Sequence, residues 1–125
     1  YQNAKRNHVD TVELWGTGKA RREFIYVDDL ADACVFLMNH YSGEEHMNIG
    51  TGEEISILEL AELVGRIAGF HGRIVCDESR PDGKERNLLD SSKLAKMGWR
   101  AAYTIDQGIE RMYHWYLEKN SENRE

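Results

Sequence analysis

The chain has 125 residues, of which 41% are hydrophobic and 30% are charged, so it can build one globular core but not two comfortable ones. Its formal net charge of −6 provides no overall basic field that would attract a nucleic acid. No run approaches the roughly 18 apolar residues of a membrane span, and the first ten residues lack the apolar core of a signal peptide. We therefore expect one soluble cytoplasmic domain that binds neither nucleic acid nor membranes.

The first third of the chain predicts two strands followed by a helix. Alternating residues in Thr11–Trp15 predict a strand that ends at Gly16-Thr17-Gly18, and Glu23–Val27 predicts a second strand. Asp28 and Asp29 then precede a helical apolar pattern, so we expect them to cap that helix. A metal or acid/base role for the two carboxylates is the alternative, and capping is much the commoner use of such residues.

The middle of the chain predicts a short strand and a well-delimited helix. His46–Gly50 is partly apolar and closed by a turn, which favours a strand. Ser56 stands three residues before Glu59, the spacing at which each side chain binds a free backbone N–H of the other. We expect a helix over Ile57–Ala68, stopped by Gly69.

The stretch that follows predicts a strand, a loop and a short helix. Arg73–Asp77 is expected to be a strand, and Glu78–Asn87 is expected to be an exposed loop that is mobile or held only by chance contacts. Ser91 or Ser92 can cap a short helix that Gly98 ends.

The last helix has its own capping pattern, formed by Thr104 and Gln107. The residues expected on its inward face recur at helical spacing: Ile105, Ile109, Met112 and Tyr116. The aromatic residues expected mainly in the core are Trp99, Tyr113, Trp115 and Tyr116.

The alternation of strands and helices predicts an α/β fold without internal repeats. Gly16 and Gly18 do not form a dinucleotide-binding fingerprint, because a strand and not a helix follows them. Cys34 and Cys76 lie in apolar stretches with no metal-site spacing, so we expect buried free thiols and no bound metal.

The best candidate for a binding site is the sequence WGTG running into RREF. Trp15 offers a flat indole, and Arg21 and Arg22 offer two guanidinium groups, which together suit a ligand with a ring and a diphosphate. A solvated charged turn beside a core tryptophan is the alternative interpretation.

The stretches WGTGKARREFIYVDDLADA and NIGTGEEISILEL resemble the carboxy-terminal part of the GDP-L-fucose synthase family. The resemblance runs from about Val12 to the last helix. The REF-x-YVDD and N-x-G-x-G pieces are shared across extended short-chain dehydrogenase/reductases. Their combination with WGTG, GFHGRIVCD and the PDG-bearing loop is typical of a much smaller group of proteins.

The resemblance implies a parent enzyme of two parts. An amino-terminal Rossmann domain would hold NADP, a Tyr/Lys/Ser set for reduction and a Cys/His pair for epimerisation. The carboxy-terminal region would bind the GDP-sugar. None of the family's catalytic or cofactor-binding positions falls within this chain. Residues 1–125 would be the substrate-binding region, residues 23–52 would pack on the missing Rossmann domain, and the parent would be a homodimer.

The resemblance also carries over three substrate-binding residues. Trp15 and Arg22 fall on the family's substrate-contacting tryptophan and arginine, and Arg86 falls on a basic loop that faces the nucleotide diphosphate. The resembled family usually has Lys or Arg where this chain has Asn87, so the resemblance predicts one cation fewer for the diphosphate at this loop.

The implied activity of the parent is conversion of GDP-4-keto-6-deoxy-D-mannose to GDP-L-fucose with NADPH, and the isolated chain is expected to be inactive. One alternative is a related sugar-nucleotide epimerase or dehydratase. Another is a stand-alone, non-catalytic interaction module.

Overall fold

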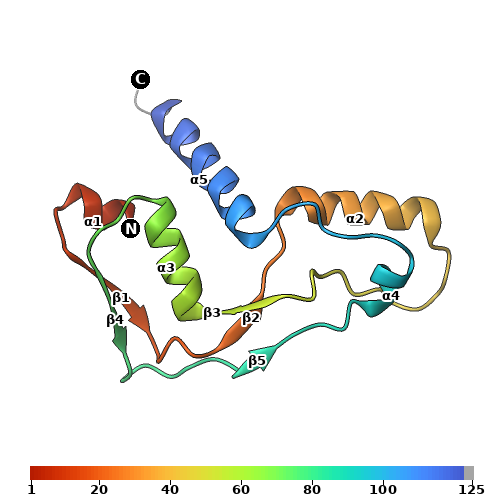
Figure 1. Cartoon of the computed structure of the whole chain (residues 1–125), viewed down its shortest axis with the longest axis horizontal. Coiled ribbons are helices and arrows are strands. Elements are labelled where there is room, and N and C mark those ends of the chain that lie inside the picture. Colours follow the sequence, from red (N-terminus) through yellow and green to blue (C-terminus); the bar gives the residue numbers. More distant parts are fainter. Residues whose placement is uncertain (123–125) are drawn as a thin grey trace.

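The computed structural model describes residues 1–122, an elongated α/β arrangement with two small sheets (Figure 1). In chain order the elements are α1 (Gln2–Arg6), β1 (Thr11–Trp15), β2 (Arg21–Glu23), α2 (Val27–His40), β3 (Glu54–Ser56), α3 (Ile57–Ile67), β4 (Arg73–Asp77), β5 (Arg86–Asn87), α4 (Ser92–Lys96) and α5 (Ile105–Glu122). Within these residues, no helix has the length and apolar character needed to cross a membrane.

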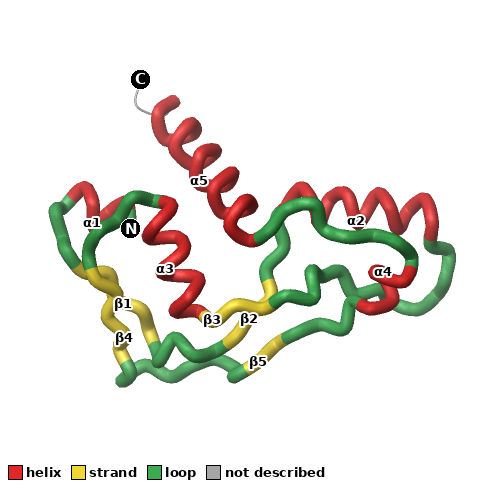
Figure 2. Tube along the Cα trace, in the orientation of Figure 1, coloured by secondary structure: helices red, strands yellow, loops and turns green. Residues whose placement is uncertain are grey.

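The two sheets are built from strands that are distant in sequence. β1 and β4 pair in parallel, with Trp15 opposite Asp77 at the end of the ladder. β2 is the central strand of the second sheet, antiparallel to β3 and parallel to β5. Figure 2 shows α1 and α3 near the β1–β4 pair and α2 and α4 toward the other end of the molecule. Parallel pairing requires a long connection, and the one from β1 to β4 contains both α2 and α3.

The best-buried cluster joins α2 to α4 and the turn that follows α4. Ala33, Leu94 and Trp99 are 0%, 1% and 6% exposed. The indole N–H of Trp99 donates to the carboxylate of Asp32 at 2.8 Å, which satisfies its polar atom inside the core. The partly buried hydrophobic residues packed around the cluster are Ile25, Phe36, Leu37, Met47, Ile49 and Ala101. The prediction that Trp99 belongs to the core is confirmed.

Asp29 connects α2 to the segment before α5. The residue is 3% exposed, and its carboxylate accepts the backbone N–H groups of Ala102 at 2.9 Å and Tyr103 at 3.1 Å. The prediction that Asp28 and Asp29 cap the helix is wrong, because α2 begins at Val27 and both carboxylates lie in its first turn. No group of potential metal ligands exists among the described residues.

Both predicted capping boxes are present. The Ser56 hydroxyl accepts the Glu59 N–H at 3.1 Å, and the Glu59 carboxylate accepts the Ser56 N–H at 2.8 Å. Thr104 and Gln107 make the same reciprocal pair at the start of α5. Gly69 has a φ of 65°, the left-handed conformation that ends a helix at low cost to glycine.

Three predictions of strand and loop are wrong. The second strand covers Arg21–Glu23 and not Glu23–Val27, His46–Gly50 forms no strand, and Arg86–Asn87 in the predicted loop is β5. Tyr26, at the N-cap of α2, is extended but unpaired. Strand propensity indicates an extended backbone, whereas the position of the partner strands decides which residues are paired.

Several side chains predicted to be buried are exposed. Trp115 is 59% exposed, Met112 is 55% exposed, and Tyr116 is 37% exposed, because other elements cover only one side of α5. On that side Tyr113 is half-buried, and its hydroxyl accepts from Gln2 Nε2 at 2.7 Å and donates to the Ala68 carbonyl at 3.4 Å. The C-terminal end of α5 extends away from the rest of the molecule (Figure 1). Cys34 lies exposed on α2, and Cys76 is half-buried. Burial of these positions does not follow from helical spacing alone, since it requires a second surface to cover the helix.

Candidate ligand-binding surface

Trp15 ends β1 with a largely exposed indole. Trp15 is 65% exposed, and its indole N–H donates to the Glu13 carboxylate at 3.1 Å. The guanidinium carbon of Arg80 lies 4.8 Å from the ring centroid. Asp77 pairs with Trp15 in the ladder, and its carboxylate lies 3.5 Å from Nε of Arg80. Arg80 is therefore held over the ring by a cation–π contact and an ion pair.

The loop between β4 and β5 is tied to the turn that follows Trp15. The Asp82 carboxylate accepts the Thr17 N–H at 2.8 Å and the Thr17 hydroxyl at 2.6 Å. These hydrogen bonds lower the pKa of Asp82. A Cβ on Gly16 would lie 2.2 Å from the Asp82 carboxylate, so the close approach requires glycine. The loop is exposed as predicted, and Asp82 gives it one specific anchor in place of the predicted chance contacts, whereas its mobility stays a prediction.

Arg22 occupies the middle of β2 and extends toward the same loop. Its guanidinium donates to the backbone carbonyl of Arg21 at 2.6 Å. A Cβ on Gly83 would lie 3.0 Å from Nη2 of Arg22, which places the guanidinium beside the loop backbone. Arg22 forms no ion pair within residues 1–122. The loop thus has two neighbours. Its Arg80 contacts Trp15, and its backbone at Gly83 lies beside the guanidinium of Arg22.

Arg86 lies on the opposite face of the sheet. It is the register partner of Arg21, whereas Asn87 is the partner of Arg22. Because side chains alternate along a strand, Arg21 and Arg86 share one face, and Arg22 and Asn87 share the other. The structure therefore brings Trp15 and Arg22 to one loop and does not bring Arg86 to the face of Arg22.

Glu54 binds both arginines of that opposite face. Its carboxylate lies 3.0 Å from Nε of Arg21 and 2.8 Å from Nε of Arg86, and its side chain is 15% exposed. The hydrogen bond to Arg86 is the main cause of the lowered pKa of Glu54, and the same bond raises the pKa of Arg86. Arg86 is thus already neutralised by a carboxylate, while Arg22 is not.

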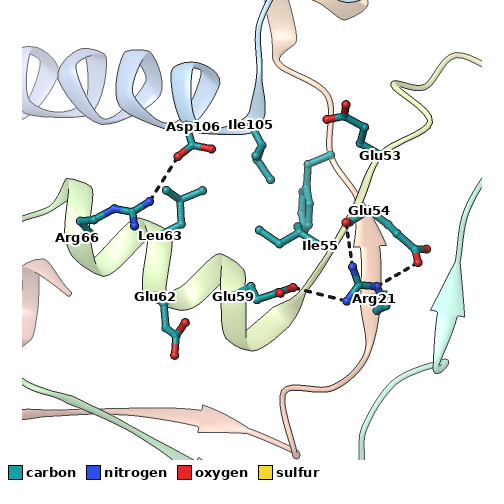
Figure 3. Close-up of a pocket in the computed structure, with 11 residues that line it drawn as sticks. Arg21, Glu53, Glu54, Ile55, Glu59, Glu62, Leu63, Arg66, Ile105 and Asp106 are labelled. Carbon is teal, nitrogen blue, oxygen red and sulfur yellow. Dashed lines mark hydrogen bonds and ion pairs between the residues drawn. The ribbon is translucent and has the colours of Figure 1, made fainter.

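A cavity of about 350 Å³ adjoins Arg21 and Glu54 (Figure 3). Its wall combines carboxylates with apolar side chains, and Arg21 reaches across it toward Glu59 at 3.6 Å. Arg66 is paired with Asp106 at 3.4 Å at the opposite side. Both guanidinium groups of the cavity therefore have carboxylate partners, so the Trp15–Arg22 side is the better surface for an anionic ligand.

The sequence RPDG predicts that Arg80 can reach a diphosphate from a loop with no apolar anchor. It does not reveal that Arg80 lies over Trp15, or that Asp82 binds Thr17. The only local signal was Asp before Gly, which is common in ordinary turns. Their partners Trp15 and Thr17 lie more than 60 residues earlier, so no local pattern could reveal the pairing.

Comparison with known proteins identifies relatives over nearly the whole chain. The model of the NAD dependent epimerase/dehydratase family matches residues 1–50. The protein named putative GDP-L-fucose synthase 2 of Arabidopsis thaliana is 53% identical over 118 residues, which are 94% of this chain and 36% of that protein. The chain thus spans about a third of the length of such relatives.

Two solved structures show the same arrangement. A GDP-L-fucose synthetase from Naegleria fowleri bound to NADP has a TM-score of 0.89 and 28% identity, covering 96% of this chain and 38% of its own. A GDP-mannoheptose C4 reductase from Campylobacter jejuni with NADP bound has a TM-score of 0.76 and 43% identity, covering 86% of this chain and 35% of its own. The α/β fold of an extended short-chain dehydrogenase/reductase is thereby confirmed.

Proposed function

We propose that this chain, a fragment of the GDP-L-fucose synthase family that spans about a third of its relatives' length, is the GDP-sugar-binding portion of such an enzyme. The intact protein would convert GDP-4-keto-6-deoxy-D-mannose to GDP-L-fucose with NADPH. The observation that carries this proposal is the 53% identity with a protein of that name across 94% of the chain. The arrangement of Trp15 and Arg22 around one loop supports it chemically.

Each proposed contact follows from the chemistry of a side chain. The exposed Trp15 residue offers a flat apolar surface. Arg22 offers a diphosphate a guanidinium that forms no ion pair with any carboxylate of residues 1–122. Arg80, fixed over the indole, is a second guanidinium on this side, and its ion-pair partner is the Asp77 carboxylate. Arg86 is the third proposed binding residue, and a direct contact with the ligand requires its Glu54 ion pair to open.

The remaining parts of the proposed enzyme lie outside this chain. Catalytic residues and NADP would belong to an amino-terminal Rossmann domain, against which residues 23–52 would pack. Exposed apolar side chains on α2, such as Val35 at 56% and Met38 at 83%, accord with such a contact. We place the intact protein in the cytoplasm as a homodimer, and the free thiols Cys34 and Cys76 accord with a reducing compartment.

A related GDP-sugar reductase is the second candidate function. The Campylobacter jejuni protein named GDP-mannoheptose C4 reductase is 43% identical, which exceeds the 28% identity of the Naegleria fowleri structure. The candidates are distinguished by comparing how fast a full-length protein that carries this segment turns over GDP-4-keto-6-deoxy-D-mannose and a GDP-heptose substrate. Preferred turnover of the heptose derivative would replace the first candidate by the second.

The binding role is tested by two arginine substitutions in that full-length protein. Arg22→Ala is expected to weaken GDP-sugar binding by about thirtyfold, since a lost charge-assisted contact costs on the order of 2 kcal/mol. Arg21→Ala is expected to have a smaller effect, because Arg21 faces the opposite side of the sheet. The exposed Lys19→Ala is the control for a general loss of positive charge. Equal effects of all three would contradict the assignment of Arg22.

The isolated chain provides a second test. GDP titrated into it, followed by ligand-detected NMR, is expected to bind with a dissociation constant no tighter than about millimolar, or roughly 4 kcal/mol of binding free energy. Micromolar affinity would show a self-contained site and favour a stand-alone binding module.

A further inference from the structure

The segment that carries the candidate surface is anchored by few contacts. All residues from 78 to 90 are exposed, so no buried side chain holds this stretch. Asp82 ties its middle to Thr17, whereas its far end depends on β5, a strand of only two residues. Strands this short gain little from their own ladder, so side-chain contacts must hold β5 in place.

The backbone link between β5 and the sheet is equally sparse. The Arg21 N–H donates to the Glu85 carbonyl at 2.9 Å, and the register then sets Arg21 opposite Arg86. The apolar residues that follow, Leu88 and Leu89, are 39% and 49% exposed. Apolar packing by these two residues therefore adds little to the short β2–β5 ladder.

The Glu54 carboxylate is the contact that joins all three strands. It lies on β3, its two oxygens bind Arg21 of β2 and Arg86 of β5, and the Arg21 guanidinium also donates to the Glu54 carbonyl at 3.1 Å. Figure 3 shows Arg21 between Glu54 and Glu59 at the edge of the cavity. Two oxygens on two guanidinium groups form a directional bridge, since each Nε–H has a fixed orientation.

We propose that Glu54 is a positioning residue: by bridging Arg21 and Arg86 it holds β5 beside β2, and so fixes the end of the 78–87 loop on which the Trp15–Arg22 surface depends. The bridge also keeps Arg21 on the cavity side, which leaves Arg22 as the arginine of β2 that faces the loop. The link to ligand binding rests on the proposed function, whereas the link between Glu54 and β5 does not.

Hydrogen exchange in this chain tests the positioning role. Glu54→Gln is expected to accelerate exchange of the Arg21 amide about tenfold, because that amide is protected only while Glu85 stays beside it. Glu53→Gln is the matched control, since Glu53 is adjacent, exposed and without a side-chain partner within residues 1–122. The Ala68 amide, bonded to the Val64 carbonyl at 2.9 Å, reports general unfolding.

A double-variant comparison separates a bridge from an ordinary loss of stability. Arg86→Gln is expected to accelerate the Arg21 amide to a similar degree, and Glu54→Gln with Arg86→Gln is expected to add little to either single change. Additive effects, an unchanged Arg21 amide in Glu54→Gln, or equal acceleration at Ala68 would each overturn the proposal. Glu54→Asp, which keeps the charge, is expected to recover part of the protection.

The ligand side is measured separately with GDP on the full-length protein. We expect Glu54→Gln to bind GDP roughly fivefold more weakly than Glu53→Gln, because the loop is displaced when the bridge is lost. Unchanged GDP binding in Glu54→Gln would overturn the step from loop position to ligand. Absence of GDP binding by the unsubstituted protein would instead overturn the proposed function, and the exchange data would still decide whether Glu54 holds β5.

Discussion

Replacement of Asp29 by alanine is expected to destabilise the chain by about 2 kcal/mol. Asp29 is 3% exposed, and its carboxylate accepts two backbone N–H groups, those of Ala102 and Tyr103. Hydrogen bonds to a charged group contribute about 1.5 kcal/mol or more each, which gives roughly 3 kcal/mol for the pair. Ala102 is itself exposed, so water can bind its backbone N–H once the carboxylate is gone, and this reduces the expected cost.

Urea denaturation followed by circular dichroism measures this free energy of unfolding. Asp28→Ala is the matched control, because Asp28 is the neighbouring acid in the same first turn and is exposed. It should cost only the helix-terminus contribution of about 0.5 kcal/mol. Asp29→Asn keeps the volume but turns one acceptor into a donor that faces an N–H, so it should lose at least half of the stabilisation. Equal losses in Asp28→Ala and Asp29→Ala, or native stability in Asp29→Asn, would refute the reasoning.

Three further predictions concern the sheet, the loop and the chemistry. Gly50→Ala is expected to destabilise the chain by about 1–3 kcal/mol, since its Cβ would lie 1.9 Å from the Glu23 carboxylate. Thermal unfolding should show that adding Glu23→Ala restores part of the lost stability, and no restoration would contradict the clash. The pKa of Asp82 is lowered, so its contribution to stability is complete above the ordinary value of 3.8 and is lost as the pH falls through the lowered value. The NMR chemical shift of the Thr17 amide should therefore change below about pH 3.8, and it should not change in Asp82→Asn. The isolated chain is expected to oxidise no NADPH in the presence of GDP-4-keto-6-deoxy-mannose, and a rate that scales with its concentration would refute this.

The sequence by itself determined those features whose partners lie within one turn or along one strand. The capping boxes of Ser56 with Glu59 and of Thr104 with Gln107 each span three residues, so local spacing was sufficient. The strands Thr11–Trp15 and Arg73–Asp77 follow from alternation and apolar content in the same way. The candidate ligand residues Trp15 and Arg22 came from the resemblance together with the chemistry of their side chains.

Only the tertiary structure decided which of these side chains share a surface. Pairing with β3 and β5 placed β2 at Arg21–Glu23, and that register set Arg22 and Arg86 on opposite faces. The partners of Glu54 and Asp82 lie 32 to 65 residues away along the chain, so a sequence window shows their charges but not their contacts. Propensity and periodicity act over a few residues, whereas an ion pair or a ladder forms only where the fold brings distant segments together.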